Sequence, residues 1–157
     1  MRKWSVSRAA KFDFIYQKLE KVLVWLEPFW MKLGYERVEK PLAFIEKHVK
    51  GFLFDCQMCG QCALHDTGMS CPMNCPKKLR NGPCGGVRAN GKCELDENMN
   101  CVWVEAWRGQ QLMTGAGKQD APVSSILAVQ FPVDHRLAGH SSWLRAVRLK
   151  HQDAEQN

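Results

Sequence analysis

Cys56-Gln57-Met58-Cys59-Gly60-Gln61-Cys62 opens the stretch of sequence that decides the fold. The chain has 157 residues, and all eight of its cysteines lie from Cys56 to Cys101. A Cys-x2-Cys-x2-Cys run can place three thiolates around one iron-sulfur cluster, while the fourth ligand comes from a remote segment, often as Cys-Pro. Cys71-Pro72 and Cys75-Pro76 both offer such a ligand. Because two 4Fe-4S clusters need eight thiolates, the count predicts two clusters.

The predicted metal ligands are all eight cysteines: Cys56, Cys59, Cys62, Cys71, Cys75, Cys84, Cys93 and Cys101. We expect the first three to share one site, since two-residue spacers hold them together. The spacing does not fix how the other five divide. We assign Cys101 to the first site and the remaining four, Cys71, Cys75, Cys84 and Cys93, to the second. Without metal we expect the cysteine-rich stretch to be disordered, because it carries few large apolar residues.

Structural zinc is the alternative, because two tetrahedral four-thiolate sites would use the same cysteines. Zinc sites usually take a Cys-x2-Cys pair from each of two loops, so the third cysteine of the opening run favours iron-sulfur without excluding zinc. Disulfides would suit a secreted chain, but residues 1–11 lack the apolar stretch and small-residue cleavage site of a signal peptide. We therefore expect a cytoplasmic protein with reduced cysteines. His65 lies near the cysteines in sequence, and we expect it beside the ligands and not among them.

The net charge and the length of the chain exclude several classes of function and fold. The formal charge is +6, but two clusters counted with their thiolates add about −4 and bring the loaded protein to about +2. We expect the basic residues among the cysteines to compensate that negative charge: Lys77, Lys78, Arg80, Arg88 and Lys92. Since no nucleic-acid-binding motif accompanies them, nucleic acid is not an expected partner. The chain is too short for a TIM barrel of about 250 residues and has no Rossmann or P-loop glycine pattern.

The first part of the chain, residues 1–51, is predicted to be an amphipathic helical arm. Apolar residues recur at spacings of three and four from Phe12 to Leu26, and Pro28 ends or resets that helix. Val38 to Val49 mark a second helix, ended by Gly51. Seven further residues exceed what two helices can bury and predict a docking surface for a partner subunit: Trp4, Phe14, Val24, Trp25, Phe29, Trp30 and Phe44. No apolar run is long enough to span a membrane.

Residues 52–112 form the predicted cysteine-rich metal module. Asn90-Gly91 predicts a two-residue hairpin that sets Cys93 opposite Arg88, and Pro76 predicts one or two helical turns after Cys75. A helix beginning at Asn100 should pack Trp103 and Trp107 over the module. Residues 113–157 are predicted to be a linker and an arm around Val123, Ile126, Leu127, Val129 and Phe131, then a basic helix capped by Ser141-Ser142 that frays over 152–157. The expected fold class is a small, metal-stabilised α+β protein.

These residues carry a resemblance to a known family. The matching pattern is Cys56-x2-Cys59-Gly60-x-Cys62-x-Leu64-x2-Thr67-Gly68-Met69-x-Cys71-Pro72-Met73-x-Cys75-Pro76-Lys77, followed by Leu79-Arg80-Asn81-Gly82-Pro83-Cys84-Gly85-Gly86-Val87, Gly91-x-Cys93-Glu94 and Cys101-Val102-Trp103. It resembles the cysteine-rich C-terminal family of methylenetetrahydrofolate reductase. The pattern covers about a third of the chain, and so many fixed positions make it specific.

The resemblance implies a function. In some relatives the module accompanies a TIM-barrel reductase, and in acetogen-type enzymes it is a separate small iron-sulfur subunit, the form that this chain resembles. A non-catalytic electron-transfer subunit is thereby implied, with no catalytic residues of its own. Its implied partners are a TIM-barrel flavoprotein, whose flavin it reduces for the conversion of 5,10-methylenetetrahydrofolate to 5-methyltetrahydrofolate, and a further electron donor. Zinc has also been associated with such modules, so a zinc-binding structural module stays open. We expect loss of residues 1–50 to weaken the complex more than it lowers the metal content.

Overall fold

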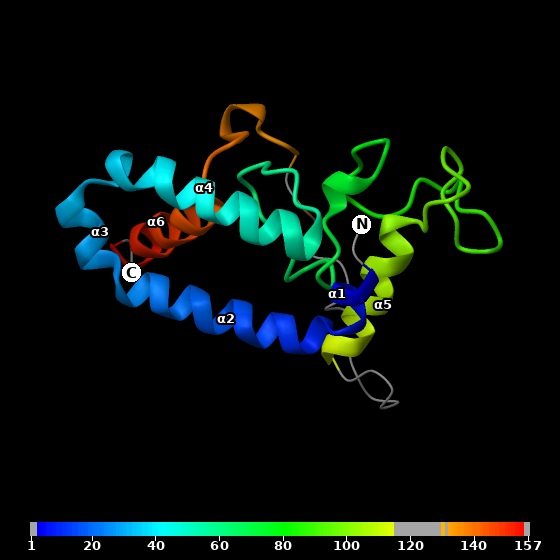
Figure 1. Ribbon diagram of the computed structural model, residues 1–157, viewed down its shortest axis with the longest axis horizontal. Helices are drawn as coiled ribbons and strands as arrows, with labels where there is room; N and C mark the ends of the chain where they lie inside the picture. The colour runs from blue at the N-terminus through cyan, green and yellow to red at the C-terminus, as the bar shows by residue number, and fades with distance from the viewer. Residues whose placement is uncertain (1–2, 115–129, 131, 156–157) are drawn as a thin grey trace.

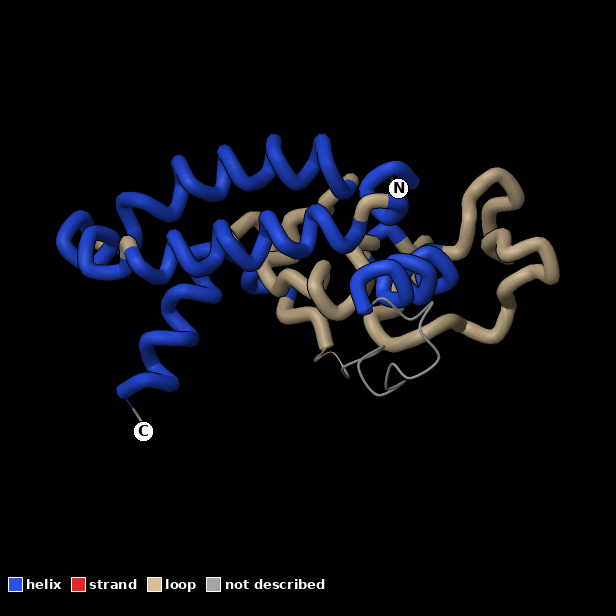
Figure 2. The backbone as a smooth tube through the Cα atoms, turned by 90° about the horizontal axis from the view of Figure 1, so that it is seen from below, coloured by secondary structure: helices blue, strands red, loops and turns tan. Residues whose placement is uncertain are grey.

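The computed structural model describes residues 3–114, 130 and 132–155. Its helical elements are α1 (Lys3–Ser7), α2 (Ala9–Trp25), α3 (Glu27–Leu33), α4 (Tyr35–Phe54), η1 (Pro72–Asn74), α5 (Val102–Thr114), η3 (His135–Leu137) and α6 (Ser142–Glu155). Helices α2, α3, α4 and α6 form one end of the protein, and cysteine-bearing loops lie with α1 and α5 at the other (Figure 1, Figure 2). Helix α6 packs against both α2 and α4, and α5 packs against α1 and α2. The C-terminal helix is therefore part of the same frame as the N-terminal helices.

The predicted N-terminal helices are present, with two changes at their ends. Pro28 lies in the first turn of α3, where its missing N–H costs nothing, so it resets the helix and does not end the helical region. Gly51 does not end the second helix, because α4 continues to Phe54. Asp55 then adopts the left-handed conformation, and the Cys56 N–H closes the helix on the Lys50 carbonyl at 3.3 Å. The end of α4 thus sets the direction in which the first cysteine leaves it.

The β part of the expected α+β class is not confirmed. Over the described part of the chain the model has no strand, and an isolated antiparallel bridge joins Lys92 to Asn100. At the turn, the Gly91 N–H binds the Arg88 carbonyl at 2.8 Å and the Arg88 N–H binds the Lys92 carbonyl at 3.0 Å. Arg88 therefore faces Lys92 and not Cys93. Gly91 has a φ of 76°, the left-handed position of a three-residue turn.

The helical turns predicted after Cys75 are wrong. Residues 76–80 form no helix, and Lys78 has a φ of 52°, which a right-handed helix does not allow. The short helix η1 instead begins at Pro72 and ends at the residue before Cys75. A Cys-Pro pair does mark the start of a short helix, but the pair is Cys71-Pro72 and not Cys75-Pro76.

The two C-terminal helices begin where the sequence predicts, but α6 continues to Glu155 and does not fray from residue 152. Helix α5 begins two residues after Asn100, and α6 begins at Ser142 with the Ser141 hydroxyl accepting a hydrogen bond from the Leu144 N–H at 3.2 Å, as a helix-capping serine does. The predicted linker from residue 115 and the predicted arm at Val123, Ile126, Leu127, Val129 and Phe131 lie outside the described residues.

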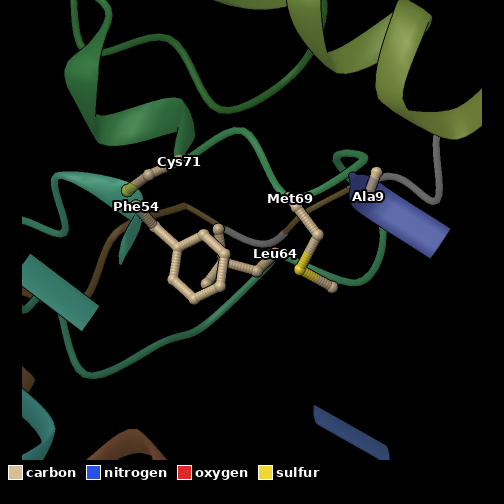
Figure 3. Packing of buried hydrophobic residues seen from close by; sticks show 5 residues of the cluster. All are labelled: Ala9, Phe54, Leu64, Met69 and Cys71. Carbon is tan, nitrogen blue, oxygen red and sulfur yellow. The ribbon is translucent and has the colours of Figure 1, made fainter. Parts of the chain in front are cut away.

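Buried apolar side chains form separate clusters, and two of these contain a cysteine. One joins Ala9, Phe54, Leu64, Met69 and Cys71 (Figure 3). Another joins Cys101, Trp103 and Ala106, and a third joins Leu23, Trp143 and Val147. The first cluster draws on α2, α4 and the cysteine loops together. The N-terminal helices consequently share their core with the cysteine-rich segment.

Candidate metal centres

Four cysteines line one enclosed cavity next to the end of α4, and we call this group the first cysteine site: Cys56, Cys59, Cys62 and Cys71. The opening Cys-x2-Cys-x2-Cys run therefore stays together, as predicted. Cys71 is buried, and its side chain forms a hydrogen bond with that of Cys56. In Figure 3 the Cys71 side chain lies beside Phe54, the last residue of α4.

A tight turn returns the chain so that Cys71 reaches this group. The Thr67 N–H binds the Ala63 carbonyl at 3.0 Å, and the Met69 N–H binds the Leu64 carbonyl at 2.8 Å. Two glycines then let this turn press directly onto α5, since a Cβ on Gly68 would lie 2.4 Å from the Gln110 nitrogen and one on Gly109 2.0 Å from the Gly68 oxygen. Contact of backbone against backbone leaves no room for any other residue at either position.

The other four cysteines line a second enclosed cavity, and we call them the second cysteine site: Cys75, Cys84, Cys93 and Cys101. Backbone pairing brings the last two together, because the Cys93 N–H binds the Met99 carbonyl and the Cys101 N–H binds the Gly91 carbonyl, each at 2.9 Å. The predicted division of the cysteines is therefore wrong by one exchange. Cys71 belongs with the opening run and Cys101 with the second group.

All eight cysteines are free thiols. Within the described residues, no group of three or more histidine, cysteine, aspartate or glutamate side chains converges closely enough to hold a metal ion. The structure thus gathers the cysteines around two cavities without arranging them as ligands, and their role as ligands stays a prediction. His65 does not line either cavity; its Nδ1 lies 2.6 Å from Oδ1 of Asp13.

A buried ion pair forms one wall of the first site. Lys50 and Glu46 are each only 1% exposed, and the Lys50 Nζ lies 2.8 Å from Glu46 Oε1. The ammonium also donates to the Ser142 hydroxyl at 2.7 Å, while the Ser141 hydroxyl donates to Glu46 Oε2 at 2.6 Å. Burial acts to lower the pKa of Lys50, but the nearby Cys62, Tyr16 and Glu46 outweigh it and hold the pKa above its usual value.

The buried pair has a consequence for the architecture. It ties α4 to the start of α6 directly against the cysteines, because Glu46, Lys50 and Ser142 all line the first cavity. The sequence holds one usable signal for this pair, the separation of Glu46 and Lys50 by four residues on one helix face. It gave none for the two serines, which lie more than ninety residues away.

A family model described as "Methylene-tetrahydrofolate reductase C terminal" matches residues 35–125, which is more than half of the chain. The chain belongs to this family. No curated protein and no solved structure matches the chain. The match contains both cysteine sites and begins with α4, so the resemblance inferred from the cysteine pattern is confirmed.

The thiols of the first site differ in how readily they ionise. The Cys56 thiol donates a hydrogen bond to Cys71, which raises the pKa of Cys56 together with burial and lowers the pKa of Cys71. Between these two thiols, the thiolate that a metal needs is therefore favoured at Cys71. The Tyr16 hydroxyl donates to the Cys62 sulfur at 3.2 Å, which adds a polar contact from α2.

Both cavities fit an anionic, sulfur-bound group. Each has one buried N–H donor with no partner among the residues that the structure describes: Arg80 Nε at the first site and Trp103 Nε1 at the second. An unpaired buried donor costs about 1–3 kcal/mol, and a thiolate-bound metal centre would offer acceptors to both. Four soft sulfur donors per cavity suit either iron-sulfur or zinc.

Of the five basic residues predicted to compensate the clusters, two line a cysteine cavity, and Lys78, Arg88 and Lys92 line neither. Arg80 lines the first cavity, and Lys77 lines the second, where it pairs with Glu94. Arg88 pairs with Glu97 at 2.8 Å. Of the two tryptophans predicted to cover the cysteines, Trp103 is buried against the second site, whereas Trp107 is 44% exposed. None of the helices in the described ranges is both long and apolar enough to cross a membrane.

Proposed function

We propose that this chain is the non-catalytic iron-sulfur subunit of a methylenetetrahydrofolate reductase complex, which delivers electrons to the flavin of a TIM-barrel catalytic partner. The observation that carries the proposal is the division of eight cysteines into two cavities of four, in a chain of this family. Four thiolates per site is the ligand set of a 4Fe-4S cluster. When bound, such clusters supply one-electron chemistry without proton transfer.

The residues of this chain would hold and insulate the two clusters. Cys56, Cys59, Cys62 and Cys71 would bind one, and Cys75, Cys84, Cys93 and Cys101 the other. Arg80 and Trp103 supply N–H groups to the two cavities, and donors to sulfur raise the reduction potential of a cluster. Buried Trp103 would also exclude water from the second site.

The surface of the helical end supports a partner. Several large apolar side chains of α2, α3 and α4 are at least half exposed, among them Trp25 at 77% and Phe44 at 64%: Phe14, Ile15, Trp25, Phe29, Phe44, Ile45 and Phe52. Val24 and Trp30, expected on the same surface, instead pack against the cluster of Leu23, Trp143 and Val147. Exposed large apolar side chains in this number are typical of a protein that binds a partner, and we assign them to contact with the catalytic partner.

A zinc-stapled structural module is the second candidate. Its support is the same donor set, because four thiolates also satisfy tetrahedral zinc. Such a module would stabilise the reductase and carry no electrons.

Metal analysis after anaerobic purification tests the proposal. We expect about eight iron and eight sulfide per chain, brown colour, and an electron paramagnetic resonance signal after reduction. Cys59→Ser and Cys84→Ser form a matched pair, one ligand in each site, and each should remove or convert one cluster and lower the iron by up to half. Stoichiometric zinc with negligible iron and sulfide would overturn the electron-transfer function in favour of the zinc module.

Co-expression tests the partner separately. The chain should co-purify with the flavin-containing reductase, and Trp25→Glu should weaken that complex without changing the iron content. Trp107→Glu, an equal change on an exposed face of α5, is the control and should leave the complex intact. If the two proteins do not co-purify, the subunit assignment fails even if the clusters are present.

A further inference from the structure

The two cysteine sites carry different charge in their walls. Lys50, Glu46 and Arg80 line the first cavity, so its ionised side chains other than cysteine sum to one positive charge. Lys77 and Glu94 line the second cavity and form an ion pair with each other, so the same sum there is zero. Both sites have four cysteines, so the charge of the other lining side chains makes the first site more positive than the second by one unit.

Arg80 is the source of the difference. Its side chain is buried at 8% exposure, its Nη1 lies 3.6 Å from the Cys59 sulfur, and its Nη2 donates to the Gln61 carbonyl at 3.1 Å. No carboxylate among the described residues lies within ion-pair distance of its guanidinium, and Nε has no partner there. Lys50 adds no net positive charge to the first site, because it forms an ion pair with Glu46 at 2.8 Å.

The charges nearest the second site are paired. Lys77 binds Glu94, and Arg88, whose Nε donates to the Cys93 carbonyl at 3.2 Å, pairs with Glu97 at 2.8 Å. These side chains are about one-third or more exposed, so water and salt screen what remains of their fields. A buried, unpaired guanidinium beside a sulfur ligand acts at higher strength.

We propose that Arg80 makes the two sites unequal, and that it holds the reduction potential of a cluster in the first site above that of a cluster in the second. Reduction adds one negative charge, which a fixed positive charge stabilises. The proposal rests on the proposed iron-sulfur function and goes beyond it by ranking the two sites. It also places the more easily reduced centre next to the open cleft of about 340 Å³ that shares Cys62 and Arg80 with the first cavity.

The direct test is a redox titration of the anaerobically purified full chain, followed by electron paramagnetic resonance with dithionite as reductant. Cys84→Ser identifies the signal of the first site. Arg80→Gln should lower the potential of that site by about tenfold in its reduction equilibrium, which is about 59 mV for one electron, and leave the second unchanged. Arg80→Lys keeps the charge and should retain more than half of the effect. Arg136→Gln removes the charge of an exposed arginine and should shift neither site.

A second variant keeps the test decisive if Arg80→Gln loses iron. Glu94→Gln frees the charge of Lys77 and should raise the potential of the second site towards that of the first, by less than the shift that Arg80→Gln causes, because Lys77 is 36% exposed and screened by water. Equal potentials in the wild type, no shift in either variant, or equal shifts at both sites would overturn the role of Arg80. Zinc in place of iron would overturn the proposed function with it, whereas intact clusters that do not respond to Arg80→Gln would overturn this inference alone.

Discussion

The first and second cysteine sites have the same number of ligands but differ in what shapes them. Helices surround the first: α4 ends at Phe54, two residues before Cys56, its residues Glu46 and Lys50 form a wall, and the start of α6 closes that wall through Ser142. Loops build the second, with α5 contributing Val102 and Trp103. The packing of helices therefore supports the first site, whereas the shape of the second site depends on the group that it binds.

Removing residues 1–50 should have the largest effect on the difference between the two sites. The deletion takes away Tyr16, Glu46 and Lys50 from the neighbourhood of the first site but no residue that lines the second cavity. We expect the truncated chain to lose the metal of the first site and to keep at most about half of the bound iron. This reverses the expectation from the sequence, in which the helical arm served the partner more than the metal.

Iron analysis of the truncated chain checks this result. Full-length Cys59→Ser is the control, since it disables the first site and keeps every helix. A truncated chain that retains all its iron would show that the helices do not support the first site.

Removal of metal should have the next largest effect, and it should affect the loops of residues 75–101 more than the helices. Buried apolar clusters hold α2, α4 and α6 together without help from the second site, whereas residues 75–101 have little core of their own beyond Cys101 and its neighbours. After chelation, amides of residues 75–101 should exchange with solvent within the first measured time points. Amides in α2 and α4 should remain protected. Uniform loss of protection across the chain would contradict the comparison.

Lys50→Met should then destabilise the first site selectively. The substitution leaves Glu46 charged and buried, which costs about 3–5 kcal/mol in comparable pairs. We expect an unfolding free energy lower by that amount in denaturant titrations and weaker retention of the metal of the first site. Lys47→Met, one turn away and exposed, is the matched control and should change the stability by less than about 0.5 kcal/mol. Equal effects of the two variants would mean that the buried pair does not support the site.

The sequence predicted the helices and the grouping of the opening cysteines better than it predicted the pairing between remote segments. Local signals sufficed for the capping serine Ser141 and for the opening run from Cys56 to Cys62, because their partners lie a few residues away. The division of the other cysteines depended on the bonds between residues 91–93 and 99–101 and on the turn that returns Cys71. No single-residue preference encodes such contacts.

The same limit explains the errors in secondary structure. Pro76 had the sequence context of a helix start, yet Lys78 adopts a left-handed backbone where the loop turns towards Cys84. Gly51 had the composition of a helix end, but the packing of Phe54 in a buried cluster extends α4 past it. In both cases tertiary contacts outweighed a local preference of about 1 kcal/mol.

The smallest expected effect distinguishes the two tryptophans of α5. Trp103→Phe removes the unpaired N–H at the second site and keeps most of the buried ring, so the lost donor and the lost packing partly offset each other. We expect a change in unfolding free energy of no more than about 1 kcal/mol, together with faster release of metal from the second site to a chelator. Trp107→Phe, on the more exposed side of α5, should change neither quantity. If the release rate from the second site is the same in both variants, the Trp103 N–H does not serve the bound metal centre, and its place in the cavity wall is a matter of packing alone.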